Sequence, residues 1–186
     1  KDVYHEASKA QAAARNDAHL ALRSHRYDRM LLSLGTWLMA DGWHIHVSSE
    51  QKQWLEAPVH ELAQRVLTSC HKTVHLHGQA LLSMPAEERH EVRIAVKKLR
   101  YATEFFASLF PGKATQSYIE SLALLQDELG VLNDAATTEL LLQHLTVPDT
   151  AALGTVSGWC ARGVTMHLTS MDEAWQKFYR KRPFWK

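Results

Sequence analysis

The chain has 186 residues, of which 46% are hydrophobic and 22% are charged. This length suffices for one domain with a buried core and is short for two. Because 21 basic residues nearly balance 20 acidic ones, the formal net charge is only +1, which excludes a general electrostatic pull on nucleic acid or membranes. An anion site must therefore come from local segregation of charge.

Hydropathy and cysteine spacing further restrict the classes of protein and the cellular compartment that fit this sequence. No apolar run approaches the roughly 20 residues that a membrane span needs, and the first residues show no signal-peptide pattern. Cys70 and Cys160 are far apart and lack metal-type spacing. We therefore expect two reduced thiols in a cytoplasmic protein, without a disulfide framework and without a cofactor.

The first expected helix covers residues 3–24, which are rich in Ala, Leu, Arg and His and contain neither Gly nor Pro. Arg15, His19 and Arg23 follow at four-residue steps and so lie on one side of it. This row has two interpretations. It is either part of an anion-binding surface or an ordinary solvated face that also carries Asp17.

A second helix is expected after a bend near Ser24, because serine favours caps and turns. Arg26 lies in its first turn, its body is apolar, and Gly42 stands where glycine commonly ends a helix. Residues 41–57 then change to a composition rich in Trp, His, Ser and Gln. We expect an internal loop there, with a short helical turn around residues 51–55.

A third helix is expected after Pro58, which suits a first helical turn. Helical spacing divides it into two faces. The expected apolar face consists of Leu62, Val66, Cys70 and Val74 or residues near them. The opposite, polar face consists of Arg65, Thr68, Lys72, His75 and Gln79. A break at residues 83–85 makes the next helix its antiparallel neighbour, so that the two polar faces can line one groove.

Histidines are frequent, with twelve in the chain. His71 and His75 are one turn apart and can reach one metal ion, with His77, His44 and His46 as further candidates. Since no clear third ligand follows from the spacing, we predict no metal site. Near neutral pH an anionic ligand can instead recruit histidines as cations.

The most informative stretch is the helix that follows Pro85. At about 100° per residue, four of its side chains lie within roughly 80° of His90 on one face: Arg93, Lys97, Arg100 and Tyr101. The apolar residues of the opposite face are Val92, Val96, Leu99 and Phe106. No acid interrupts the basic face, and like charges at these spacings repel. Either an anion or an acidic helix completes this face, or it is a plain solvated surface.

The next helix is expected at about residues 114–129. Its acidic row consists of Glu120, Asp127 and, if the helix continues, Asp134. We interpret this row as carboxylates that orient Arg and Lys side chains. Gly130 is expected to relax or break the helix, and another helix is expected over residues 135–145.

A final helix is expected over residues 150–179, followed by a basic aromatic tail at residues 180–186. The tail has two interpretations. Phe184 and Trp185 either dock onto the bundle or contact a ligand directly, and we favour docking.

Two motifs resemble the second half of a CHAD domain, the conserved histidine α-helical domain. They are His90-x-x-Arg93-x-x-x-Lys97-x-x-Arg100-Tyr101 with Glu104-Phe105-Phe106, and Leu125-Gln126-x-x-Leu129-Gly130-x-Leu132-Asn133-Asp134. Arg26-Tyr27 and Pro183-Phe184-Trp185 extend a weaker similarity over most of the chain. The resemblance implies an all-helical domain of two similar four-helix units that binds inorganic polyphosphate in a basic channel. Such domains are often joined to others, including triphosphatase-type catalytic domains.

One departure from the family pattern matters. The family usually carries a similar histidine-led basic helix in each half, whereas this sequence has one and begins at Lys1 without an initiator Met. We therefore expect an N-terminal portion of the domain to be missing here, and an upstream domain or a partner chain to complete the channel.

No period-two strand pattern persists, so the predicted fold class is all-α. We expect one CHAD-like domain over residues 1–186, an antiparallel helical bundle of about six to seven helices in four-helix-bundle units. The residues alone predict an anion-binding bundle, and the resemblance makes the ligand inorganic polyphosphate in a basic groove. The candidate binding residues are His90, Arg93, Lys97, Lys98, Arg100, Tyr101, Arg65, Lys72, Arg15, Arg23 and Arg26.

We predict a binder and not an enzyme, with no catalytic residues. The sequence shows no Walker-type glycine loop, no HExxH motif and no carboxylates clustered for magnesium. The alternative is an accessory or catalytic part of a polyphosphate or triphosphate phosphohydrolase. Nucleic-acid binding is disfavoured because few aromatics interleave the basic faces for base stacking. Affinity should fall steeply with ionic strength and rise modestly below about pH 6.5, where histidines gain protons.

Overall fold

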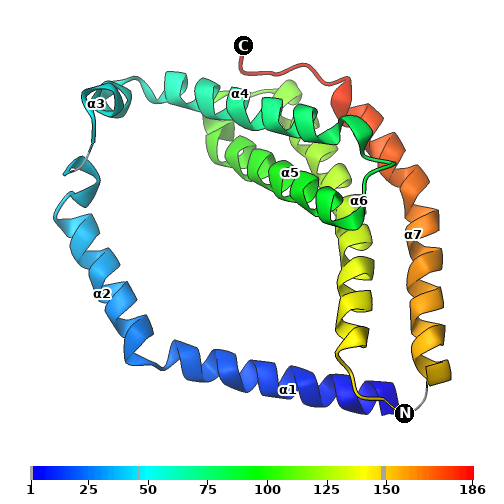
Figure 1. Cartoon of the computed structure of the whole chain (residues 1–186). Coiled ribbons are helices and arrows are strands. Elements are labelled where there is room, and N and C mark those ends of the chain that lie inside the picture. Colours follow the sequence, from blue (N-terminus) through cyan, green and yellow to red (C-terminus); the bar gives the residue numbers. More distant parts are fainter. Residues whose placement is uncertain (1, 46, 148–149) are drawn as a thin grey trace. The chain divides into compact units, whose positions relative to one another are not determined.

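The computed structural model describes residues 2–45, 47–147 and 150–186. Within these ranges it contains helices and connecting turns and no strand, which confirms the all-α prediction (Figure 1). The α-helices are α1 (Asp2–Leu22), α2 (His25–Met39), α3 (Ser49–Glu56), α4 (Val59–His77), α5 (Ala86–Phe106), α6 (Lys113–Gln143) and α7 (Thr150–Tyr179). Short 3-10 turns are η1 (Gly42–His44), η2 (Gly78–Ala80) and η3 (Ala107–Leu109). None of the described helices is both long enough and apolar enough to cross a membrane.

The chain divides into two compact units. The first, here called the N-terminal unit, comprises residues 1–57 and 145–152. The second, here called the core unit, comprises residues 58–144 and 153–186. Every residue of the main hydrophobic cluster belongs to the core unit, so α4 to α7 carry the packed interior.

In the core unit, α5 packs between α4 and α6. The face of α5 predicted to be apolar is buried: Val92, Val96, Leu99 and Phe106 all belong to the core. Leu122, Leu125 and Leu129 of α6 and Met171 and Phe178 of α7 complete the same cluster. Because the hydrophobic stripe of α5 faces this core, its charged residues are left on the outer side.

The buried face of α4 agrees with the prediction in part: Val74 is buried, and Val66 and Cys70 pack partly buried against the core. Ala63, Leu67 and Val74 are fully buried, whereas Leu62, assigned to the apolar face, is 38% exposed. In the structure α4 contacts α5 on one side and the aromatic residues of α7 and the C-terminal tail on another, so a different arc of the helix is covered.

The expected break at Gly130 is wrong, because α6 runs without interruption from Lys113 to Gln143. Leu125, Leu129 and Leu132 lie on both sides of the glycine and bury in the same core. A glycine inside a helix costs about 1 kcal/mol relative to alanine. Burial of one leucine contributes about 1.5–3 kcal/mol, so packing outweighs the local preference to break.

The region expected as an internal loop, residues 41–57, contains η1 and the eight-residue helix α3. Ser48 and Gln51 close a capping box, in which the Ser48 hydroxyl accepts from the Gln51 N–H and the Gln51 side chain accepts from the Ser48 N–H. This reciprocal pair satisfies two backbone donors at the helix start. The short turn expected near residues 51–55 is therefore a longer, capped helix.

At the end of α2, Asp41 and Gly42 have other roles than the helix stop expected at Gly42. Asp41, not Gly42, adopts the left-handed conformation, with φ of 48°. Aspartate tolerates this region better than most residues. Gly42 is needed for space, since a Cβ atom there would lie 2.1 Å from Cδ1 of Trp37.

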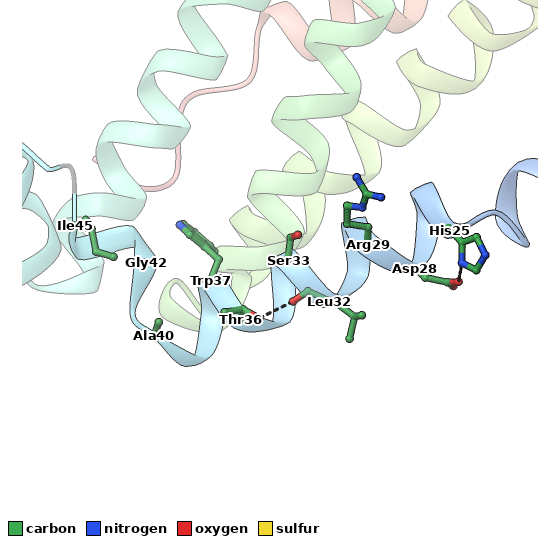
Figure 2. Close-up of a pocket in the computed structure, with 10 residues that line it drawn as sticks. All are labelled: His25, Asp28, Arg29, Leu32, Ser33, Thr36, Trp37, Ala40, Gly42 and Ile45. Atoms are coloured by element: carbon green, nitrogen blue, oxygen red, sulfur yellow. Dashed lines mark hydrogen bonds and ion pairs between the residues drawn. The ribbon is translucent and has the colours of Figure 1, made fainter.

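The N-terminal unit leaves much apolar surface open. No residue of α2 is buried, and its exposed large side chains include Met30, Leu31, Leu34, Trp37 and Leu38. Figure 2 shows an open pocket along α2 and η1, where Arg29, Ser33 and Trp37 follow one another at one-turn steps. Exposed apolar area of this kind is characteristic of a surface that another element covers.

The junction between α4 and η2 gives a stability prediction. A Cβ atom at Gly78 would lie 2.1 Å from Cη2 of the buried Trp175, so Gly78→Ala forces the indole to move. We expect a loss of about 1–3 kcal/mol in the free energy of unfolding, measured by urea denaturation. Gly130→Ala is the matched control, because nothing lies within 4 Å of its added methyl group. This control should gain about 0.5–1 kcal/mol; equal effects of the two substitutions would contradict the packing.

Candidate anion-binding site

The candidate site is the outer side of α5. This helix begins after Pro85, and Glu87 and Glu88 occupy its first turn, where carboxylates complement the positive end of the helix dipole. Its buried face anchors it on the core, so the basic residues share the remaining surface. Of the predicted residues on α5, His90, Lys98 and Tyr101 are exposed, whereas Arg93, Lys97 and Arg100 are half-buried.

His90 is tied to α6. Its Nδ1 donates to Oδ1 of Asn133 at 2.6 Å, across 43 residues of sequence. With the Asn133 oxygen as acceptor, the hydrogen of this bond belongs to Nδ1. The orientation of this imidazole is thereby fixed by a second helix.

Arg93 has an unpaired donor. Its Nε atom is buried and has no hydrogen-bond partner, and the same holds for Oε1 of Gln126 on α6. Buried polar atoms in proteins are nearly always paired, so such an atom calls for an explanation. The half-buried Arg93 side chain keeps its charge, and its guanidinium can donate charge-assisted hydrogen bonds to an anionic oxygen.

Arg100 and Lys97 are held by neighbours on α5. The Nε of Arg100 donates to Oε1 of Glu104 at 2.8 Å. This hydrogen bond raises the pKa of Arg100, and the carboxylates of Glu104 and Asp127 add to the rise. The Nζ atom of Lys97 lies 5.6 Å from the centre of the Tyr101 ring, within cation–π range. The Arg100 guanidinium is therefore permanently charged, and Glu104 holds its orientation.

Only part of the predicted acidic row acts as expected. Asp127 interacts with the charge of Arg100, which fits an orienting role. Glu120 instead accepts a hydrogen bond from Gln116 of its own helix, at 3.2 Å. The carboxylate paired with Arg100 is Glu104, one turn further along α5, and the sequence analysis did not assign it this function.

Lys98 lies on the α4 side of α5. Burial raises the pKa of the Cys70 thiol of α4, and the nearby Lys98 ammonium opposes this rise. Two further predicted residues, Arg65 and Lys72, are exposed on α4. Lys98 therefore extends the basic surface from the outer side of α5 towards α4.

The predicted polar face of α4 is divided in the structure. Thr68 and His75 do not face a groove with Arg65 and Lys72 but pack against aromatic residues. Thr68 Oγ1 accepts from the Trp185 indole N–H at 3.0 Å, and the His75 ring lies 5.6 Å from the ring of Phe178. The tail covers this side of α4, which confirms docking of Trp185 on the bundle.

Arg15, Arg23 and Arg26 belong to the N-terminal unit. Arg15 and Arg23 line a shallow groove on α1 together with His19, which matches the predicted four-residue row. Arg26 lies exposed on α2 and does not line this groove. The site assembled by the core unit consists of the α5 and α4 residues alone.

In the histidine pair of α4, His71 has a hydrogen-bond partner and both rings have ring partners. Among the described residues, no group of three or more His, Cys, Asp or Glu side chains is arranged to hold an ion. His71 Nδ1 lies 2.8 Å from the Tyr118 hydroxyl, and the His71 and His75 rings are 4.2 Å apart. His46, one of the predicted further ligands, falls outside the described residues.

The sequence did not predict the partner that α6 contributes, Asn133, which accepts a hydrogen bond from His90. Asn133 belongs to the second motif and follows Gln126 by seven residues, two helical turns, so the two residues share one side of α6. This shared side is the signal that could have identified Asn133.

Comparisons with known proteins identify the family and fold of this chain. A family model, the CHAD domain, matches residues 2–143. The chain is also similar to the crystal structure of the CHAD domain from the plant Ricinus communis, with a TM-score of 0.75 and 29% sequence identity. This similarity covers 94% of the present chain and 58% of the plant chain. A comparison with curated proteins found no match. On the match of sequence and fold together, the chain belongs to the CHAD-domain family.

Proposed function

We propose that this chain is an inorganic polyphosphate-binding module whose ligand lies along the outer side of α5. The observation that carries the proposal is the cationic row His90, Arg93, Lys97 and Arg100, in which Arg93 keeps a buried N–H without a partner. No carboxylate interrupts this row along the helix, apart from Glu104 at its end. Family membership supports the choice of polyphosphate among anions.

The chemistry of the row suits a linear polyanion. Polyphosphate carries roughly one charge per phosphate, and cationic side chains that neutralise such a chain release its condensed counterions. Arg93 and Arg100 can each bind phosphate oxygens through a planar fork, while Lys97 and Lys98 act as point charges. The His90 side chain, oriented by Asn133, can donate from its second nitrogen when protonated.

The N-terminal unit supports a second element of the proposal. Its apolar α2 surface is exposed, and the chain spans only 58% of the length of the plant CHAD structure. We propose that an upstream part of the domain or a partner chain covers α2 and adds cations to the channel. Cys70 and Cys160 are both free thiols, which fits a cytoplasmic setting.

The test is a titration of the chain with long-chain polyphosphate, with orthophosphate and double-stranded DNA in parallel. We expect tight binding of polyphosphate alone. The logarithm of the association constant should fall with the logarithm of salt concentration with a slope of about −3 to −4, as four or five neutralised phosphates require. A salt-independent complex, or equal affinity for DNA, would overturn the proposal.

The same samples separate binding from hydrolysis. We expect no release of orthophosphate when tripolyphosphate is incubated with the chain and Mg²⁺. Release that depends on the chain and on the metal would replace the binding proposal with its rival, a catalytic part of a polyphosphate or triphosphate phosphohydrolase.

A further inference from the structure

The C-terminal tail, residues 180–186, closes over one side of α4. Trp185 is only 2% exposed, and its indole N–H donates to Thr68. Its carbonyl accepts from Gln64 Nε2 at 2.7 Å, and Lys181 Nζ donates to Ser117 Oγ at 2.6 Å. The tail is therefore held by hydrogen bonds to α4 and α6 as well as by burial.

His71 of α4 lies beneath this contact, and His75, one turn further along α4, stacks near His71 and lies against α7. The His71 ring lies 5.8 Å from the Trp185 ring and 6.1 Å from the Phe178 ring. His75 lies 4.8 Å from the Tyr179 ring, and its Nε2 atom is buried without a hydrogen-bond partner. Both imidazoles therefore sit in aromatic surroundings that favour their neutral form.

The charges around the pair offer nothing to stabilise a proton. The titratable or charged groups that face it from other elements are the hydroxyl of Tyr118 on α6, that of Tyr179 on α7 and the ammonium of Lys186 in the tail. Neither histidine forms an ion pair with a carboxylate of the described residues. The two rings, 4.2 Å apart, would also repel each other once both were charged.

We propose that His71 and His75 form an acid-sensitive latch, in which protonation of the pair releases the C-terminal tail from α4. Nδ1 of a neutral His71 can accept a hydrogen bond from the Tyr118 hydroxyl, whereas an imidazolium can only donate hydrogen bonds. Release lets the charged rings reach water. It also uncovers Thr68 and adds two cations next to Lys72 on the same helix. The latch operates without any ligand on α5, so it goes beyond the proposed function.

The direction of the pH dependence follows from proton linkage. The pKa of His71 is lowered to about 4, mainly by desolvation and additionally by the charges of His75 and Lys186, and desolvation lowers the pKa of His75. The docked tail thus binds fewer protons than the released one. Docking is at full strength above about pH 6.5, the ordinary value for histidine, and weakens as the pH falls towards the docked value.

Hydrogen exchange of the Trp185 indole N–H, followed by NMR, measures the opening directly. Between pH 7.5 and 5.5 we expect its protection factor in the wild-type chain to fall roughly three- to tenfold, allowing for the partial exposure of the histidines. Backbone amides in the centre of α5, such as that of Val96, should show no such fall. Far-UV circular dichroism should keep its helical signal over this range.

The variant His71→Gln with His75→Gln should hold a pH-independent protection factor, because neither side chain titrates. His77→Gln, a change of an exposed histidine on the same helix, is the matched control and should respond like the wild type. If the double variant does not fold, His75→Gln alone should weaken the response. A constant wild-type factor, an unchanged response in the histidine variants, or an equal loss of protection in α5 would each overturn the latch.

Discussion

Replacing Arg93 and Lys97 together by glutamate should raise the dissociation constant for long-chain polyphosphate on the order of a hundredfold or more at about 0.15 M salt. Hydrogen bonds to charged groups contribute about 1.5–3 kcal/mol each, and reversal adds repulsion to their loss. Arg93 supplies the unpaired N–H, and Lys97 lies at the centre of the row between His90 and Arg100. Titration at several salt concentrations should also show that the slope of the logarithm of the association constant against the logarithm of salt concentration becomes less negative by about two.

The matched control is Arg162→Glu with Lys177→Glu. Both residues are exposed on α7, so this pair changes the net charge equally without touching α5. It should lower affinity by no more than a few-fold, through the long-range potential alone. Arg93→Gln with Lys97→Gln repeats the test without reversed charges if the half-buried Arg93 does not accept a glutamate. Equal losses in the α5 and α7 pairs would show that only net charge matters, and the α5 site would be rejected.

The helices predicted best were those whose buried apolar residues pack mainly against a single hydrophobic core. The apolar stripe of α5, from Val92 to Phe106, faces a single core, and all four predicted residues are buried. The last helix was also predicted with its observed bounds, residues 150–179. In both cases local propensity and burial favour the same answer, so a single-sequence pattern suffices.

The predictions were wrong where tertiary contacts, and not local sequence, determine helix continuity and burial. Gly130 is a poor helix residue, but the leucines around it hold α6 continuous. On α4, His75 and Thr68 are polar in sequence and were assigned to a groove, whereas Phe178 of α7 packs against His75 and Trp185 of the tail covers Thr68, each from over a hundred residues away. No periodicity within α4 encodes a contact with residue 185.

The candidate site shows the same division. The pattern of α5 alone predicted its basic row, and the structure places His90, Arg93, Lys97 and Arg100 on the outer side of that helix. The sequence did not predict that Asn133 orients His90 or that Lys98 is directed towards α4. Those facts depend on how α6 and α4 are rotated about their own axes, which the packing of side chains fixes and the sequence of one helix does not.

The stability of the core unit should depend strongly on its last aromatic residue. Trp185→Ala is expected to lower the free energy of unfolding by about 3–5 kcal/mol at pH 8, where the tail is docked. The indole is nearly fully buried, and its ring contacts Tyr118 at 5.3 Å and Phe184 at 4.9 Å. Its loss also leaves Thr68 Oγ1 without its donor. Urea denaturation followed by circular dichroism measures the change.

Trp159→Ala removes the same side chain from an exposed position on α7, since Trp159 is 76% exposed. This control should change the free energy of unfolding by less than about 0.5 kcal/mol. The difference between the two variants isolates the burial of Trp185 from any general effect of losing a tryptophan. Equal stabilities would mean that the tail is not docked in solution. In that case Thr68 would face solvent at neutral pH, and α4 would present it beside Arg65 and Lys72 on the polar face that its sequence predicts.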